Sequence, residues 1–332
     1  MNFHPAKLWE EIGDGKVRCN LCRFHCTIAD GRRGRCGVRE NREGSLYSLV
    51  YGSTVAENVD PIEKKPLYHF HPGSNSLSLA TVGCNFRCLH CQNYQISQWP
   101  HERTGIPGTE TSPQDVVRHA IESGSASIAY TYTEPTIYFE YAFDTAVEAR
   151  KAGIKNVFVT NGYTTTAALE AIAPYLDAAS VDLKGFSDQA YRDVTGASLN
   201  GVLDCLRDYR RLGIWLEVTT LVIPGHNDSE DELRQIATFI SEELGRDVPW
   251  HISAFYPTYK MLDRPPTPVA TLSLARDLGR RAGLEYVYMG NVDDSDGGNT
   301  VCPGCGKTVI RRQRLQFLDT ELTGNRCQHC QH

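Results

Sequence analysis

Long hydrophobic runs are missing from this sequence of 332 residues. No stretch of 18 or more apolar residues occurs, although 41% of the residues are hydrophobic. This absence excludes a conventional membrane-spanning helix. The first ten residues mix Asn, His, Lys and Glu, and they lack the apolar stretch of a secretion signal. We therefore expect a cytoplasmic protein that has no membrane partner.

An excess of basic charge is missing as well. The 34 Lys and Arg residues are outnumbered by 40 Asp and Glu residues, which gives a formal net charge of -6. The overall charge therefore does not favour nucleic acid as a partner. The length suits one substantial domain with smaller modules attached to it.

Cysteine, by contrast, is abundant and unevenly placed. Spacings of two or three residues suit thiolates that converge on a metal, whereas secreted disulfide scaffolds are usually much shorter chains. We therefore predict a reducing compartment and three metal centres. The twelve cysteines form three groups and one isolated residue: Cys19, Cys22, Cys26 and Cys36; Cys84, Cys88 and Cys91; Cys302, Cys305, Cys327 and Cys330; and Cys205.

Apolar strands alternate with helical stretches through the middle of the chain. Such alternation predicts a parallel sheet wrapped by helices. Six or seven βα units favour an α/β barrel of the TIM type, complete or incomplete, over a flat doubly wound sheet. The expected strands are 77–81, 127–132, 156–160, 179–183, 215–222, 251–255 and 286–289. The expected helices are 112–122, 137–152, 165–176, 201–212, 229–244 and 271–282.

The cysteine groups and the βα pattern together divide the chain into three parts. Residues 1–70 are predicted to form a Cys-rich metal-binding module with a connector. Residues 71–295 are predicted to form the barrel, and residues 296–332 a tail similar to a zinc ribbon or a rubredoxin. The tail is too short to bury a sufficient core, so we expect it to need metal for folding.

The central triplet, Cys84, Cys88 and Cys91, has the spacing Cys-x3-Cys-x2-Cys directly after an expected strand. Three thiolates bind three irons of a 4Fe-4S cluster and leave the fourth iron open. The amino and carboxylate groups of S-adenosylmethionine (SAM) can chelate that iron, and one electron then breaks the S–C5′ bond of SAM. We assign these cysteines to catalysis. A zinc knuckle with His90 as its fourth ligand is disfavoured, because His90 is poorly directed beside Cys91.

The triplet and its surroundings resemble the radical SAM superfamily, with His90 where most members have an aromatic residue. Residues 132–136 (Tyr-Thr-Glu-Pro-Thr), 160–163 (Thr-Asn-Gly-Tyr), 182–185 (Asp-Leu-Lys-Gly) and 250–253 (Trp-His-Ile-Ser) resemble the AmmeMemoRadiSam-system radical SAM proteins, relatives of pyruvate formate-lyase activating enzyme. The likeness covers nearly the whole chain. It implies an incomplete (β/α)6 barrel, a 4Fe-4S cluster and SAM.

The resemblance also implies contacts with SAM from residues near strand ends. Glu134, helped by Thr133, is expected to accept a hydrogen bond from the SAM amino group. Lys184 is expected to bind the SAM carboxylate while Asp182 orients it, although an ordinary ion pair explains these two residues nearly as well. The remaining expected contacts come from Asn161, Thr219 and His251.

The two outer cysteine groups differ in what they indicate. Cys302-x2-Cys305 and Cys327-x2-Cys330 have the spacing of a structural zinc ribbon, with iron as the alternative. The group Cys19, Cys22, Cys26 and Cys36 suits either zinc or a second 4Fe-4S cluster. The isolated Cys205 is expected to be a buried small hydrophobe.

The leading functional hypothesis is an enzyme that abstracts hydrogen from a protein, as activating enzymes do. A reductant such as flavodoxin or ferredoxin is expected to supply the electron. One alternative is radical modification of RNA or a small metabolite, with Arg311, Arg312 and Arg314 gripping the substrate. Another is a metal-binding scaffold without catalysis. The sequence leaves the substrate and the oligomeric state open.

Overall fold

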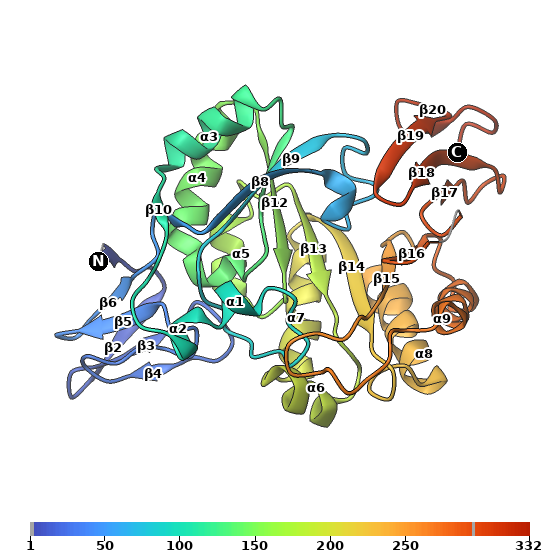
Figure 1. Cartoon of the computed structure of the whole chain (residues 1–332). Coiled ribbons are helices and arrows are strands. Elements are labelled where there is room, and N and C mark those ends of the chain that lie inside the picture. Colours follow the sequence, from blue (N-terminus) through green and yellow to red (C-terminus); the bar gives the residue numbers. More distant parts are fainter. Residues whose placement is uncertain (1–2, 294–295) are drawn as a thin grey trace.

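An open sheet lies at the centre of this computed structural model, which describes residues 3–293 and 296–332 (Figure 1). Across the described residues its strand order is β16-β15-β14-β13-β12-β11-β9-β8. Seven of these strands, β9 and β11 to β16, run parallel to one another, and β8 is antiparallel to β9. Because β8 and β16 end the order without pairing, the barrel does not close. The strands are β8 (Ala56–Pro61), β9 (Asn75–Ala80), β11 (Ser127–Tyr130), β12 (Lys155–Thr160), β13 (Ala178–Asp182), β14 (Trp215–Val222), β15 (Trp250–Ala254) and β16 (Val287–Gly290).

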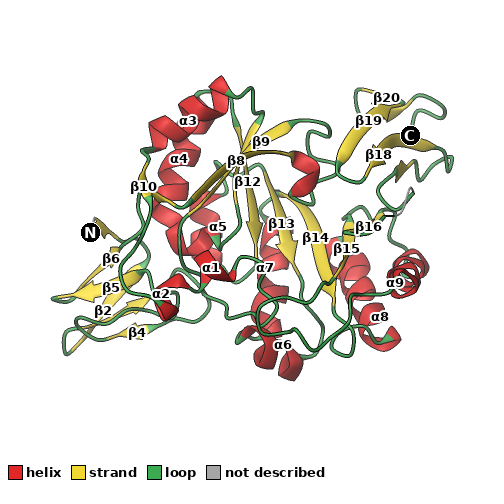
Figure 2. Cartoon of the chain, in the orientation of Figure 1, coloured by secondary structure: helices red, strands yellow, loops and turns green. Residues whose placement is uncertain are grey.

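Helices lie around this sheet and connect its strands (Figure 2). Ser112 shows how one begins: its hydroxyl accepts the Asp115 N–H, and the Asp115 carboxylate accepts the Ser112 N–H. The helices are α1 (Tyr94–Ser97), α2 (Trp99–Glu102), α3 (Pro113–Glu122), α4 (Phe139–Lys151), α5 (Thr166–Ile172), α6 (Asp188–Thr195), α7 (Leu199–Arg211), α8 (Glu230–Phe239) and α9 (Val269–Arg281). Shorter turns are η1 (Ile62–Lys64), η2 (Pro135–Tyr138) and η3 (Ile240–Leu244).

The incomplete α/β barrel predicted from the sequence is confirmed. Each predicted strand overlaps an observed one, and its bounds differ by no more than two residues. Helix α6 and the antiparallel strand β8 were not predicted. Cys205 is fully buried in α7, as expected, beside the buried Leu206 and Tyr209. No helix in the described ranges is long and apolar enough to cross a bilayer.

The N-terminal cysteines belong to a module of two small sheets. One sheet has the order β2-β3-β4 and the other β1-β6-β5, and β7 pairs separately with β10. The module lies at one end of the molecule, beside α2 (Figure 1). Its strands are β1 (His4–Pro5), β2 (Trp9–Gly13), β3 (Lys16–Cys19), β4 (Thr27–Ile28), β5 (Arg39–Arg42), β6 (Ser45–Ser48) and β7 (Ser53–Thr54), and β10 is Thr109–Glu110.

The segment after β8 closes the amino end of the barrel. Ile62 and Leu67 are fully buried there against Ala129, Val157 and Ala178 from three strands. This packing fills the barrel on the side away from the carboxyl ends of the strands. The carboxyl ends are the edge at which parallel barrels usually build their active sites.

The tail lies at the opposite end of the molecule from the N-terminal module (Figure 1). Arg312 fastens it to the connector: the guanidinium donates to Tyr68 O at 2.6 Å and lies 4.4 Å from the centre of the Tyr68 ring. The predicted domain boundary at residue 295 falls outside the described residues. The tail strands are β17 (Thr300–Val301), β18 (Thr308–Gln313), β19 (Gln316–Thr320), β20 (Leu322–Thr323) and β21 (Arg326–Cys327).

Candidate active site and metal centres

The cysteine triplet occupies the loop that follows β9. The Phe86 N–H points to Cys84 Sγ at 3.4 Å, and Cys91 Sγ lies 3.2 Å from Ser97 Oγ. Burial raises the pKa of Cys84 and raises the pKa of Cys88 to about 12. Thiolates at these positions therefore need a positive partner, which a metal centre provides.

Asn161 brings the loop after β12 against this triplet. Its Nδ2 donates to Asn85 Oδ1 at 2.8 Å and lies 3.8 Å from Cys84 Sγ. Asn161 Oδ1 and Asn85 Nδ2 are buried without a hydrogen-bond partner. Such orphaned groups are costly unless a ligand satisfies them. The loop that carries Cys84 and the loop that carries Asn161 therefore present one unpaired acceptor and one unpaired donor.

Glu134 also lies at this edge, but its carboxylate faces the protein. Oε1 accepts from Thr136 N at 3.1 Å, from Thr136 Oγ1 at 2.6 Å and from Thr160 Oγ1 at 2.7 Å, and Oε2 accepts from Asn161 N at 2.8 Å. Thr133 Oγ1 likewise donates to Thr81 O at 2.9 Å. Glu134 and Thr133 therefore order the strand-end loops, and protein donors take much of the acceptor capacity of Glu134. The expected contact of these two residues with SAM stays a prediction.

Asp182 and Lys184 form the ion pair that the sequence suggested. Lys184 Nζ donates to Asp182 Oδ2 at 2.6 Å, and the Lys184 side chain is 14% exposed while that of Asp182 is 34% exposed. Burial disfavours the charged lysine, but Asp182 more than offsets this and holds the pKa of Lys184 above its ordinary value. Cys88 lies close enough to contribute to the same shift. Lys184 therefore keeps its positive charge close to the cysteine triplet.

His90 has a larger place in this site than the sequence reasoning gave it. It is buried, and neither ring nitrogen has a hydrogen-bond partner. Burial, with Lys184 and His226 nearby, lowers the pKa of His90 to about 3, so the ring is neutral. A buried polar ring without partners suits a ligand contact. Its position between Cys88 and Cys91, where most radical SAM proteins have an aromatic residue, was the signal that the sequence offered.

His251 and Thr219 do not stand where the sequence placed them. His251 is the second residue of β15, and its Nε2 lies 2.7 Å from Glu217 Oε2. Its ring packs 4.7 Å from that of Tyr68, in the connector that closes the barrel. Thr219 is in the middle of β14, with its hydroxyl 3.3 Å from Ser180 Oγ. The structure therefore corrects the predicted strand-end position of both residues, and one ring nitrogen of His251 has a carboxylate partner.

The four tail cysteines converge. Cys302 Sγ lies 3.6 Å from Cys330 Sγ, and Cys305 Sγ lies 3.8 Å from Cys327 Sγ. All four sulfurs fall within 4.8 Å of one another. A tetrahedral site with a Zn–S bond of about 2.3 Å places its sulfurs about 3.8 Å apart. The tail group therefore has the dimensions of a site for one tetrahedral metal ion.

The arginines near the tail turn are engaged with the protein itself. Arg311 pairs with Asp319 at 2.8 Å and with Glu321 at 2.7 Å. Arg312 is buried. Arg314 lies 3.3 Å from Asp293. The positive charge of this run is therefore partly neutralised by carboxylates of the protein itself.

Comparison with known proteins places this geometry in context. Residues 78–239 match the Radical SAM superfamily. An uncharacterized protein of Methanocaldococcus jannaschii is 46% identical over 330 residues, which cover 99% of this chain and 98% of that protein. The isethionate sulfite-lyase activating enzyme of Oleidesulfovibrio alaskensis is 31% identical over 162 residues, which cover 48% of this chain and 52% of that enzyme.

A likeness to a solved structure concerns the fold alone. The crystal structure of a radical SAM methyltransferase from Sphaerobacter thermophilus aligns with a TM-score of 0.52 and 15% identity, over 72% of this chain and 71% of that chain. The open parallel barrel described above is therefore a fold that is shared with a radical SAM enzyme.

Proposed function

The chain belongs to the radical SAM superfamily and is an enzyme of that class, and we propose that Cys84, Cys88 and Cys91 hold its catalytic 4Fe-4S cluster. When bound and reduced, such a cluster supplies the electron that cleaves SAM to methionine and a 5′-deoxyadenosyl radical. The supporting observation is the triplet loop at the carboxyl edge of the sheet, with unpaired buried groups of Asn85, His90 and Asn161 around it.

The chain's own residues would position SAM in three ways. Lys184 offers a fixed cation to the carboxylate of SAM, and Asp182 orients it. Asn161 Oδ1 and the ring of His90 offer unpaired polar groups. Glu134 holds the Asn161 backbone in place through the hydrogen bond to its N–H. The direct contact between Glu134 and the SAM amino group, and the contacts from Thr133, Thr219 and His251, have no such support.

We propose a protein as the substrate that loses hydrogen. A relative named for the activation of isethionate sulfite-lyase supports this class of substrate, and that relative matches about half of the chain. Carboxylates beside Arg311 and Arg314 reduce the net positive charge that an RNA partner would need, which also favours a protein. Membership of the AmmeMemoRadiSam group remains a prediction.

The activity test uses anaerobically reconstituted protein reduced with dithionite. We expect conversion of SAM to 5′-deoxyadenosine and methionine, and its loss in Cys88→Ala, because two thiolates cannot hold the cluster in the required form. Cys205→Ala is the matched control, since Cys205 lies outside the three cysteine groups. Full activity in Cys88→Ala would refute the assignment.

The substrate class is tested by adding cell extract anaerobically and measuring 5′-deoxyadenosine above the uncoupled rate. If the substrate is a protein, protease treatment of the extract abolishes the stimulation, whereas RNase treatment or removal of small molecules by filtration leaves it. Stimulation that survives protease but is lost after RNase or filtration would overturn the proposal of a protein substrate.

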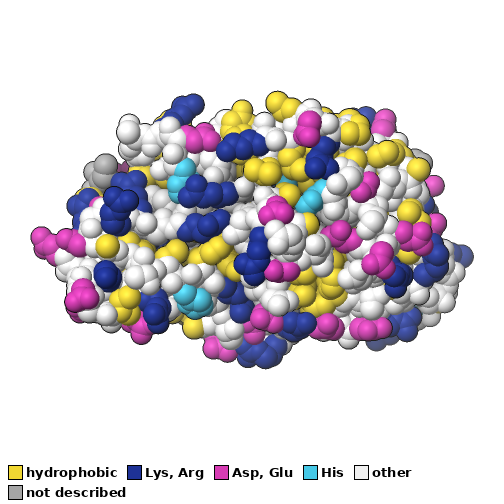
Figure 3. Space-filling model, turned by 90° about the horizontal axis from the view of Figure 1, so that it is seen from below, with side chains coloured by type: hydrophobic (Ala, Val, Ile, Leu, Met, Phe, Trp, Pro, Cys, Tyr) yellow, Lys and Arg dark blue, Asp and Glu magenta, His cyan; other side chains and the backbone are white. Residues whose placement is uncertain are grey.

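We also propose a docking place for the electron donor. A hollow of about 430 Å³ is lined by four arginines and His101, and one of these arginines, Arg87, lies between Cys84 and Cys88. Figure 3 shows the molecule from below the view of Figure 1, and Lys and Arg side chains lie on the half that holds the N-terminal module. Such a surface attracts an acidic carrier of the flavodoxin or ferredoxin type. The arginines are Arg32, Arg33, Arg35 and Arg87.

Reversing the charge of Arg87 tests this docking. Arg87→Glu should slow SAM cleavage supported by flavodoxin or ferredoxin, most strongly at low salt, while cleavage supported by dithionite stays unchanged. Arg118→Glu is the matched control, because Arg118 lies on the exposed face of α3 away from the hollow. Equal rates with the protein donor in both variants would rule out docking at the hollow.

A further inference from the structure

The N-terminal cysteines surround one cavity in the body of the protein. Cys19, Cys22, Cys26 and Cys36 all line it. Apolar side chains of Leu21, Ile28 and Ile137 complete much of its wall. Four thiols that line one cavity mark a binding site for a thiophilic metal centre.

The spacing of these thiols differs from that of the tail. Among the described residues, the tail cysteines are the one set of three or more possible ligands whose atoms all lie within 4.8 Å of one another. The N-terminal four do not meet this condition, and neither do Cys84, Cys88 and Cys91. One zinc ion draws its thiolates together at about 3.8 Å, given Zn–S bonds of about 2.3 Å. A 4Fe-4S cluster holds each thiolate on a different iron, and its thiolates therefore stand farther apart.

Arg39 gives a second, independent sign of a ligand. Its side chain lines the same cavity, and its Nε is buried without a hydrogen-bond partner. The other two guanidinium nitrogens are hydrogen-bonded: Nη1 donates to Glu140 Oε1 at 3.0 Å, and Nη2 donates to Lys7 O at 2.5 Å. An unsatisfied N–H in this place suits the sulfur of an anionic cluster.

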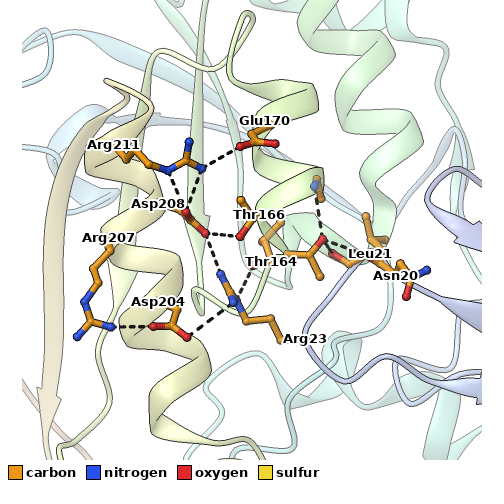
Figure 4. Close-up of polar contacts among 12 residues, drawn as sticks. Asn20, Leu21, Arg23, Thr164, Thr166, Glu170, Asp204, Arg207, Asp208 and Arg211 are labelled. Atoms are coloured by element: carbon orange, nitrogen blue, oxygen red, sulfur yellow. Dashed lines mark hydrogen bonds and ion pairs between the residues drawn. The ribbon is translucent and has the colours of Figure 1, made fainter.

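The module is fixed to the loop that carries Asn161. Figure 4 shows Arg23, the neighbour of Cys22, reaching Thr164 and Asp208. Arg23 Nε donates to Thr164 O at 3.0 Å and Nη2 to Asp208 Oδ2 at 2.9 Å. Cys22 itself forms an antiparallel bridge with Thr164. The N-terminal cavity is therefore held in a fixed place relative to the catalytic loops.

The two cysteine loops also touch directly. Gly83, which precedes Cys84, has a φ of +101°, and a Cβ there would meet Cys36 O at 3.0 Å and Val38 Cγ1 at 2.7 Å. Phe24 lies between Cys22 and Cys26, and its ring centre is 6.4 Å from that of Phe86, which lies between Cys84 and Cys88. Packed aromatic rings and backbone thus fill the space between the two groups.

From this geometry we infer that Cys19, Cys22, Cys26 and Cys36 bind a second 4Fe-4S cluster, which exchanges electrons with the cluster at Cys84, Cys88 and Cys91. A low-potential one-electron carrier reduces the N-terminal cluster by one electron. That cluster is reoxidised as it passes the electron to the catalytic cluster, and neither step moves a proton. The exchange rests on the proposed function, whereas the iron content of the N-terminal site does not.

The deciding variant removes the catalytic site and keeps the N-terminal one. In Cys84→Ala/Cys88→Ala/Cys91→Ala, reconstituted anaerobically, we expect about four irons and four sulfides per chain and the Mössbauer spectrum of a 4Fe-4S cluster. Iron near zero together with an extra equivalent of zinc would overturn the inference. Cys302→Ser/Cys305→Ser is the control, which should lose one tail metal ion and keep the inorganic sulfide and the iron of the 4Fe-4S clusters. This count does not depend on whether the protein cleaves SAM.

A complementary variant and a spectroscopic measurement test the exchange. Cys22→Ser/Cys36→Ser should lose about four irons and keep a SAM-dependent change in the EPR spectrum of the catalytic cluster. In the wild type, two reduced clusters this close should relax each other, so the EPR signal should saturate at higher microwave power than in either variant. If the microwave-power saturation of the wild-type EPR signal equals the sum of the curves from the two variants, electron exchange between the clusters is refuted. If the double variant does not fold, the triple variant still decides the metal.

Discussion

Replacing Glu134 by Gln separates two roles of this residue with the change of a single atom. The carboxylate accepts four hydrogen bonds from Thr136, Thr160 and the Asn161 backbone. In Glu134→Gln the amide oxygen can take the place of Oε1 and keep three of them. The amide nitrogen then faces the Asn161 N–H, which previously donated to Oε2 at 2.8 Å.

The cost follows from that one lost acceptor. A buried donor left without a partner costs about 1–3 kcal/mol. The Asn161 backbone should move away, and with it the side chain that contacts Asn85 and Cys84. If SAM binding depends on this loop, a loss of about 1–2 kcal/mol corresponds to a dissociation constant about 5–30-fold higher.

Two measurements on reconstituted protein decide between the roles: the SAM dissociation constant and the thermal midpoint. A positioning role predicts that both worsen, while direct contact with SAM alone predicts weaker binding at an unchanged midpoint. Glu148→Gln is the matched control, because Glu148 pairs with Lys151 three residues further along α4. If Glu134→Gln leaves both quantities at their wild-type values, the reasoning about this loop is wrong.

Two further predictions concern the tail and the floor of the barrel. Cys302→Ser/Cys305→Ser should release about one metal ion and make residues 300–332 protease-sensitive while SAM cleavage largely survives, because metal binding and folding are linked in such modules; loss of 5′-deoxyadenosine formation with intact 4Fe-4S absorbance would instead give the tail a catalytic part. Burial raises the pKa of Glu217, but His251, His69 and the Tyr68 N–H outweigh it and lower that pKa to about 2. Its stabilising effect is therefore present above the ordinary value near 4.5 and is lost as the pH falls towards 2. The gap in thermal midpoint between wild type and Glu217→Gln should shrink over that range, and a gap independent of pH would contradict this sign.

The spacing of residues along the chain predicted most of the metal-binding sites, because the ligands of one site are close together in the sequence. The triplet at Cys84, Cys88 and Cys91 and the two tail pairs are readable because metal ligands recur at short intervals. The alternation of strands and helices likewise predicted the open parallel barrel, whose period is a local property. The fold class therefore follows from residue spacing and periodicity, while the superfamily was indicated by the resemblance of the triplet and the motifs around it.

Side-chain partners across strands were decided only by the tertiary structure. The family resemblance assigns Glu134 and His251 to SAM, while the partners they have in the protein appear only in the fold. Glu134 accepts four hydrogen bonds, and His251 pairs with Glu217. His90 is the opposite case. Both of its ring nitrogens are buried without a hydrogen-bond partner, and only the folded structure reveals this.

The metal preference of the outer cysteines also depended on three dimensions. Their spacing in the chain allowed zinc or iron at both ends. In the folded protein the tail sulfurs converge to the separation of a single ion, while those around the cavity of Cys19, Cys22, Cys26 and Cys36 stay apart. Sequence spacing limits which thiols can share a metal, but the distance between their sulfurs is set by the packing of the surrounding chain, and that distance distinguishes one ion from a cluster.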